Sequence, residues 1–364
     1  MTPPAAGREP ATTGLGPAAA ALAHLRHLTP RDRYLLEILA QHLVLTAEQI
    51  ARLCFEDPNT ARKRLVLLTR RGILDRFRAS VYPGSQAWRY TLGHVGASML
   101  VARTDRPLPR PGAHAERILR LAQSPRLDHL LGVNDFFVSL IHQARTQPAH
   151  GYALVGWHNE RWATAHCAGL ARPDAMGTWA QRDPGTAPPH PAPAPLRAPS
   201  GPTGPSAQPA GPLARPITSA PASPGTRPRP RTSREITFFL EHDTGTEPLS
   251  RLLDKLPGYA EAARGDGPDH PVLFWLGSRR REAILQDRLS RTRTTLKIAT
   301  ATRQYADETG TGPAGALWWI PGQHQRLQLI DLPTAYARTS TTGTAIRPSA
   351  GPSSGPDPAA GRVA

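Results

Sequence analysis

The chain has 364 residues, with 44 lysines and arginines against 28 aspartates and glutamates, so its formal net charge at pH 7 is +16. Such an excess favours a polyanionic partner, and no apolar run approaches the ~20 residues of a membrane-spanning helix, so nucleic acid is preferred over a membrane. Two cysteines exclude a disulfide framework and a four-cysteine zinc site, and the N-terminal residues lack the pattern of a signal peptide. We therefore expect a cytoplasmic protein.

Composition divides the chain into folded and unfolded parts. Residues 182–233 contain 16 prolines and almost no large apolar side chains, so they cannot bury enough surface to offset the entropy lost on ordering. We predict a disordered insertion there and disordered tails at both ends of the chain. The tails cover residues 1–27 and 340–364, which leaves one folded unit at residues 28–103 and a second at residues 113–181 and 234–335.

The first folded unit shows the order helix, short helix, basic helix and hairpin. Thr29 and Thr46 are typical N-caps, and a third helix follows Asp57-Pro58 and ends at Gly72. Strand-like runs at residues 73–79 and 87–92 then flank a Pro-Gly turn. This order is typical of a winged helix-turn-helix, whose third helix enters the major groove of double-stranded DNA while the wing touches the backbone.

The candidate DNA-binding residues are the polar and basic side chains of the third helix and the wing. Arginine can form two hydrogen bonds to a guanine edge, and asparagine to an adenine edge. They are Asn59, Arg62, Lys63 and Arg70 on the helix and Arg76, Arg78 and Arg89 on the wing. The alternative is a winged fold used for dimerisation or protein contact, with these charges simply solvated.

The second unit follows a mixed α/β plan. Apolar periodicity predicts helices at residues 114–123, 127–145, 248–263 and 280–300, and strands at residues 152–157, 171–179, 236–243, 272–276 and 317–320. Without the insertion, about 17 residues separate Asp174 from Glu241, a normal distance between neighbouring strands. Because side chains alternate along a strand, Glu241 and Asp243 are expected on one face.

Three carboxylates are expected to meet between these strands. If Asp174 faces the same way as Glu241 and Asp243, the three form a site for Mg²⁺ or Mn²⁺, which prefer oxygen ligands. Such a metal could activate water for attack on a phosphodiester, with Lys255 on the next helix stabilising charge. The alternative is a strand end with solvated acids and an ordinary surface lysine.

Several segments together resemble the replication-relaxation family of plasmids and integrative elements. They are the unit 28–103, the run His129–Asp135, the triplet Arg172-Pro173-Asp174, and the segment Phe239–Glu247 followed by Lys255 and Tyr259. Family members are associated with plasmid replication and pair a winged helix with an α/β domain that is itself similar to the PD-(D/E)xK nuclease superfamily.

The resemblance implies an α+β or α/β fold class: a winged helix-turn-helix domain followed by a restriction-endonuclease-like αβββαβ domain carrying the insertion. In the nuclease superfamily the residues at the positions of Asp174 and Glu241 hold the metal. Asp243 stands where the superfamily has its lysine, so catalysis would require Lys255 to replace that lysine.

Three functions are compatible with these features. The one we expect is a DNA-binding protein of plasmid or integrative-element replication or maintenance, whose nuclease-like domain is of doubtful activity. The second is an active Mg²⁺-dependent DNA endonuclease that uses Asp174, Glu241, Asp243 and Lys255. The third is a winged-helix transcriptional regulator whose second domain binds a ligand or partner.

Overall fold

The computed structural model describes residues 28–78, 86–102, 107, 109–182, 234–264 and 267–342. The predicted N-terminal tail, the predicted insertion after Arg182 and residues 343–364 lie outside this range. Helix α13 (Leu332–Thr342) extends beyond residue 340, where the sequence predicts a disordered tail. Helices and strands combine into a mixed α+β fold, which confirms that part of the prediction.

The N-terminal unit consists of helices packed on a small sheet. Its first three helices are α2 (Pro30–His42), α3 (Ala47–Cys54) and α4 (Pro58–Arg70), and each begins at a side-chain cap, on Thr29, Thr46 and Asp57 respectively. The sheet has the order β1-β3-β2, with β1 at Leu45–Thr46, β2 at Leu74–Phe77 and β3 at Arg89–Leu92. Helices α5 (His94–Val101) and α6 (Pro111–Ala122) follow.

A seven-stranded sheet forms the centre of the second unit, in the order β10-β9-β8-β7-β6-β5-β4. Its strands β4 to β6 are antiparallel, β6 to β8 are parallel, and β8 to β10 are again antiparallel. The bounds are β4 Tyr152–Asn159, β5 Ala175–Gln181, β6 Arg234–His242, β7 Val272–Leu276, β8 Ile298–Thr302, β9 Trp318–Trp319 and β10 Arg326–Leu327. The predicted pairing across the insertion is confirmed, because β5 and β6 pair from Ala175 opposite Leu240 to Gln181 opposite Arg234.

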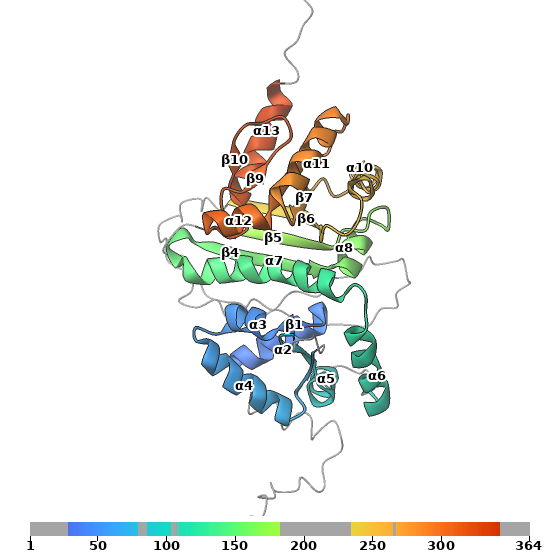
Figure 1. Cartoon of the computed structure of the whole chain (residues 1–364), viewed down its shortest axis with the longest axis vertical. Coiled ribbons are helices and arrows are strands. Elements are labelled where there is room, and N and C mark those ends of the chain that lie inside the picture. The colour runs from blue at the N-terminus through green and yellow to red at the C-terminus, as the bar shows by residue number, and fades with distance from the viewer. Residues whose placement is uncertain are drawn as a thin grey trace, which may run out of the picture.

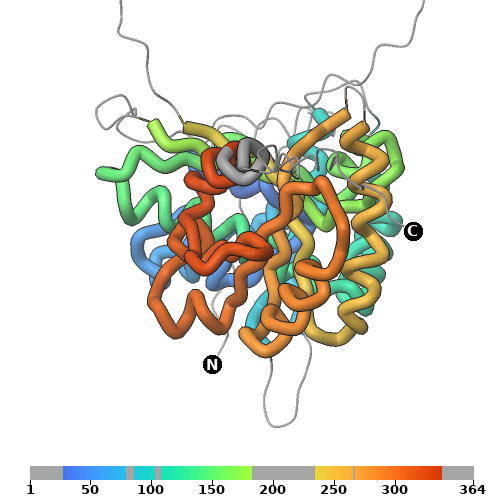
Figure 2. Tube along the Cα trace, turned by 90° about the horizontal axis from the view of Figure 1, so that it is seen from above, coloured from blue at the N-terminus to red at the C-terminus, as the bar shows by residue number. Residues whose placement is uncertain are grey.

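Helices cover both faces of this sheet. Helix α7 (Leu127–Thr146) lies between the N-terminal unit and the sheet, whereas α9 (Leu249–Leu253), α10 (Leu256–Ala262) and α11 (Arg279–Arg291) lie on the opposite side, as Figures 1 and 2 show from two directions. Alternation along β6 explains the two layers: Phe238 packs in the core with α7, and Phe239 packs in the core with α9, α10 and α11.

Polar contacts fix the N-terminal unit to α7. The side-chain amide of Asn134 donates to the carbonyl oxygens of His42 and Val44 at 3.1 and 2.8 Å. Gln49 on α3 donates to the carbonyl of Leu131 at 2.9 Å, and Arg52 pairs with Asp135. Because buried side chains of both units also form one continuous hydrophobic cluster, the two units share a core.

Two predicted helices differ from the structure. The helix predicted over residues 280–300 is wrong beyond Arg291, because Thr292 is extended and Ile298–Thr302 form β8. The threonines and isoleucine of that stretch favour a strand over a helix. The helix predicted over residues 248–263 is broken into α9 and α10, since Pro257 lies in the first turn of α10.

The elements that the sequence did not predict are mostly short. They are β1, α5, α8 (Glu160–His166), α12 (Arg303–Thr309), β10, α13 and the 3-10 turns Pro148–His150 and Leu329–Asp331.

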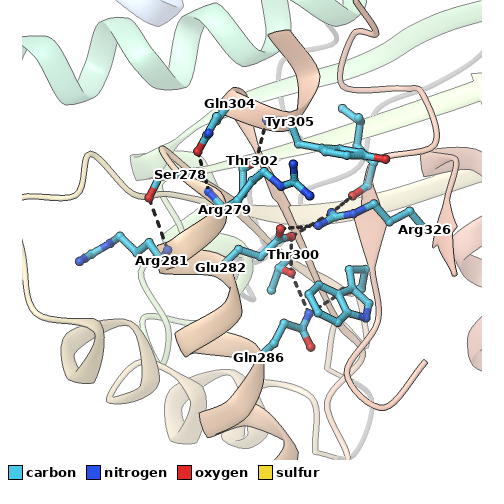
Figure 3. A network of polar contacts seen from close by, with 12 residues as sticks. Ser278, Arg279, Arg281, Glu282, Gln286, Thr300, Thr302, Gln304, Tyr305 and Arg326 are labelled. Atoms are coloured by element: carbon cyan, nitrogen blue, oxygen red, sulfur yellow. Dashed lines mark hydrogen bonds and ion pairs between the residues drawn. The ribbon is translucent and has the colours of Figure 1, made fainter. Parts of the chain in front are cut away.

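A buried polar network ties α11 to the far edge of the sheet (Figure 3). Glu282 accepts hydrogen bonds from Arg326 at 3.1 and 2.6 Å and from the Thr300 hydroxyl at 2.8 Å. Gln286 donates to the same Thr300 hydroxyl at 2.7 Å and to the carbonyl of Trp319 at 2.9 Å. We call Glu282, Gln286, Thr300 and Arg326 the Glu282 network.

Candidate functional site

Asp174, Glu241 and Lys255 meet at the end of β6. Asp174 directly precedes β5, and Glu241 is the last residue but one of β6, so the antiparallel pairing of these strands brings them together. The Lys255 ammonium pairs with Glu241 and lies 3.9 Å from Oδ1 of Asp174. We call these three residues the carboxylate–lysine centre.

Lys255 reaches the two carboxylates because it stands in the break between α9 and α10. Asp254 is the C-cap of α9 and Lys255 is the N-cap of α10. On either side of the break, Leu252 and Leu256 are buried against the sheet. The apolar residues thus hold both short helices down, and the lysine between them is directed at the strand ends.

Each carboxylate of the centre has a second partner. The Tyr259 hydroxyl donates to Oε1 of Glu241 at 2.5 Å. Nε2 of His129 lies 3.1 Å from Oδ1 of Asp174, and the backbone N–H of His242 donates to Oδ2 of Asp174 at 2.8 Å. His129 and Tyr259 were not among the predicted site residues, although both lie in segments that carry the family resemblance.

The two carboxylates have shifted pKa values in opposite directions. Burial, and then the charge of Asp174, raise the pKa of Glu241 to about 8 against the opposing effect of Lys255. Burial alone would raise the pKa of Asp174 too, but the contact with His129 and the charge of Lys255 outweigh it and lower that pKa. For Lys255, the charges of Glu241 and Asp174 outweigh burial and raise its pKa. Near neutral pH the centre therefore holds an ionised Asp174, a charged Lys255 and a largely protonated Glu241.

Asp243 does not join this centre, and the expected cluster of three carboxylates is wrong. Arg281, in the first turn of α11, donates to both carboxylate oxygens of Asp243, in one case at 2.9 Å. Among the described residues, no group of three or more His, Cys, Asp or Glu side chains is arranged to hold a metal ion. Asp174 and Glu241 remain as two oxygen donors, with the Lys255 ammonium between them.

Helix α7 approaches the end of β6 at Gly132. A Cβ atom at this position would lie 2.4 Å from Cε1 of the His242 ring, so the helix can approach the strand only because the residue has no side chain. The His242 ring is buried, which lowers its pKa to about 4, and it packs edge-on against His129 with ring centroids 5.4 Å apart. This close approach of α7 brings the His129 ring into contact with the Asp174 carboxylate.

The predicted DNA-binding residues have three different surroundings. Four of them are exposed on α4: Asn59, Arg62, Lys63 and Arg70. Two on the wing, Arg76 and Arg78, place their guanidinium groups over the Trp88 ring, 4.1 and 4.3 Å from its centroid. The structure does not bring Arg89 to that surface, because its mostly buried side chain pairs with Asp128 of α7 at 3.1 Å.

Comparison with known proteins gives one match. No helix in the described part of the chain is long and apolar enough to cross a membrane. No curated protein and no solved structure gives a significant match. The family model described as replication-relaxation matches residues 36–190, which include most of the N-terminal unit, α7 and Asp174. The chain thus matches the replication-relaxation family over these residues, as its sequence motifs predicted.

Proposed function

We propose that this chain is a cytoplasmic DNA-binding protein of plasmid or integrative-element replication or maintenance, and that its N-terminal unit is a winged helix-turn-helix. The family match supports the replication-related role. The observation that carries DNA binding is the exposed basic face of α4, formed by Arg62, Lys63 and Arg70 beside Asn59.

The packing of α4 directs these charges outward. Ala61, Leu65 and Leu68 are buried on its inner face, so residues on the other face point to solvent. Helix α3 contacts both α4 and α7, and α4 lies at the outer side of the molecule (Figure 1). A duplex can therefore dock on α4 and place its backbone near Arg76 and Arg78 without meeting the large sheet.

Replacing Arg62 and Lys63 with alanine tests this proposal. We expect weaker binding of duplex DNA and a salt dependence, measured as log K against log salt, whose slope falls by about one for each lost phosphate contact. Arg288→Ala/Arg291→Ala on α11 is the matched control, because both of its arginines are exposed and the loss of charge is equal. Equal losses in the two variants would show that α4 is not the docking surface.

We further propose that the second unit is a nuclease-like domain of the PD-(D/E)xK type. Asp174 and Glu241 would hold Mg²⁺ or Mn²⁺ together with waters and phosphate oxygens, and Lys255 would stabilise charge. The support is the position of Lys255, which contacts one carboxylate and lies 3.9 Å from the other. We favour binding without cleavage, because Lys255 occupies the position between the two carboxylates and Asp243 is held by Arg281.

Incubation of supercoiled plasmid with the purified protein, with and without Mg²⁺ or Mn²⁺, separates the two activities. Nicked or linear product that disappears in Asp174→Asn and in Lys255→Met would establish the endonuclease instead. Unchanged plasmid, bound by the protein, supports the favoured proposal. DNA footprints at promoters rather than at a replication origin would indicate a transcriptional regulator.

A further inference from the structure

Glu160 bridges two arginines beside the carboxylate–lysine centre. One oxygen of its carboxylate lies 3.0 Å from Nη2 of Arg126, and the other lies 3.5 Å from Nη2 of Arg172. The arginine side chains are 61% and 74% exposed. We propose that Arg126 and Arg172 bind a phosphate of a nucleic-acid backbone next to the centre, at the position that the Glu160 carboxylate now fills.

Both arginines are anchored to the centre through the chain. Arg172 lies two residues before Asp174, and the intervening Pro173 is buried. Arg126 directly precedes α7, one helical turn before His129, whose Nε2 lies 3.1 Å from Asp174. A phosphate held between these arginines would therefore lie at the edge of the centre, and neighbouring nucleotides would extend across it.

Another anion can replace Glu160 as the partner of the two arginines. An exposed ion pair of this kind contributes little to stability, because water and salt screen it. Two guanidinium groups facing one carboxylate also leave one positive charge uncompensated. The contrast is Arg281, whose side chain is 20% exposed and which donates to both oxygens of a buried Asp243.

A phosphodiester suits this pair better than a carboxylate of an acidic protein. Its two non-bridging oxygens can each accept charge-assisted hydrogen bonds from these guanidinium groups. The net charge of +16 adds a long-range attraction for a continuous polyanion. This inference rests on the proposed function, because it takes nucleic acid as the partner.

The test compares DNA affinities of full-length variants by fluorescence anisotropy, with labelled duplex and single-stranded oligonucleotides. We expect Glu160→Gln to bind about fivefold more tightly, because the competing carboxylate is removed. Arg126→Gln/Arg172→Gln should bind about tenfold more weakly, with a salt slope smaller by up to about two. In the triple variant, the gain from Glu160→Gln should disappear.

The matched controls are Asp287→Asn and Arg291→Gln. Each removes the charge of one partner of an ion pair on α11, in which the side chains of Asp287 and Arg291 are 57% and 77% exposed. An affinity of Glu160→Gln equal to that of Asp287→Asn would overturn the inference. So would a gain that persists without the two arginines, since it would then come from net charge alone. Binding of polyglutamate as tight as that of DNA, with the same gain, would point to an acidic protein and also overturn it.

These outcomes are distinguishable from failure of the proposed function. If the wild-type protein binds no DNA, the proposed function itself is wrong and the inference falls with it. If the wild type binds DNA and Arg62→Ala/Lys63→Ala weakens binding, but the Glu160 and arginine variants match their controls, only the inference fails. If the double arginine variant does not fold, the DNA affinity of Glu160→Gln, compared with that of Asp287→Asn, still tests the inference.

Discussion

Two glutamates of this chain are buried beside a positive charge, and their surroundings differ. Glu241 and Glu282 are 0% and 1% exposed. Arg326 donates two hydrogen bonds to Glu282 and packs its guanidinium over the rings of Tyr305 and Trp319, so its side chain is held on several sides. Lys255, which pairs with Glu241, is 35% exposed and is also close to a second carboxylate, that of Asp174.

The comparison shows that burial of an ion pair does not by itself indicate a functional site. A bidentate arginine leaves Glu282 fully paired, and its contacts join α11, β8 and β10, which is a structural role. At the carboxylate–lysine centre, two carboxylates compete for one partly exposed ammonium, so protonation or another cation can change its state. Exchangeable partners, rather than burial, distinguish the candidate site from the Glu282 network.

The largest effect is expected from Glu282→Gln. This change leaves the charge of Arg326 without its partner in a mostly buried position, which should cost about 3 kcal/mol of unfolding free energy. Glu241→Gln should cost clearly less, because Lys255 remains partly solvated and Glu241 is already largely protonated near neutral pH. Urea denaturation of both variants gives the two values, and equal losses of unfolding free energy would contradict the difference between Glu282 and Glu241.

A second effect, at Glu241, is expected from pH. The pKa of Glu241 is raised from 4.5 to about 8, so between these pH values the folded protein holds a proton that the unfolded chain releases. Stability from this group is complete below about pH 4.5 and is lost as pH rises to about 8, with a slope of at most about 1.4 kcal/mol per pH unit.

Comparison with Glu241→Gln isolates this contribution to the pH dependence. Other groups act with the opposite sign: burial lowers the pKa of His42 from 6.5 to about 3, so its contribution is lost as pH falls through that range. Unfolding free energies of wild type and variant should therefore differ in slope between about pH 4.5 and 8. Parallel curves would show that Glu241 has an ordinary pKa.

The smallest effects are expected from removing one hydroxyl in each region. Tyr259→Phe deletes one hydrogen bond to a buried glutamate, which should cost about 1 kcal/mol. Thr300→Val deletes one to Glu282 and one from Gln286, which should cost about 2 kcal/mol. Tyr259→Phe should in addition raise the pKa of Glu241, because that hydroxyl stabilises the charged form. The pH at which stability levels off should shift upward in this variant alone; a shift in Thr300→Val as well would contradict the distinction.

Local patterns predicted much of the fold. N-caps and apolar periodicity located α2, α3, α4 and α7, and the composition of the insertion allowed the pairing of β5 with β6 to be inferred. Periodicity failed at residues 292–300, where a charged helix passes into a threonine-rich strand without a proline or glycine to mark the end of the helix. Short elements such as α8 and β10 lack the length that a periodic pattern needs.

The candidate site was predictable only in part. Asp174 and Glu241 were placed together because sequence separation and strand alternation are local properties. Arg281 could not be matched to Asp243 in advance, because that pair depends on how α11 packs, and 38 residues separate the two in the chain. The contact of His129 with Asp174 and the contacts of Glu160 with two arginines could not be predicted either, since they join elements that only the tertiary fold brings together.

Gly132 is the only glycine in α7, and it is the position at which this helix meets the ring of His242. Sliding α7 along the strand end by one turn would bring a larger side chain, Asp128 or Phe136, against that ring. One absent methyl group thus sets the register of the helix on the sheet. Asn134 and Asp135 of the same helix hold the N-terminal unit. The register of α7 therefore also sets the distance between α4 and the carboxylate–lysine centre, and a DNA that touches both would have to span that fixed distance.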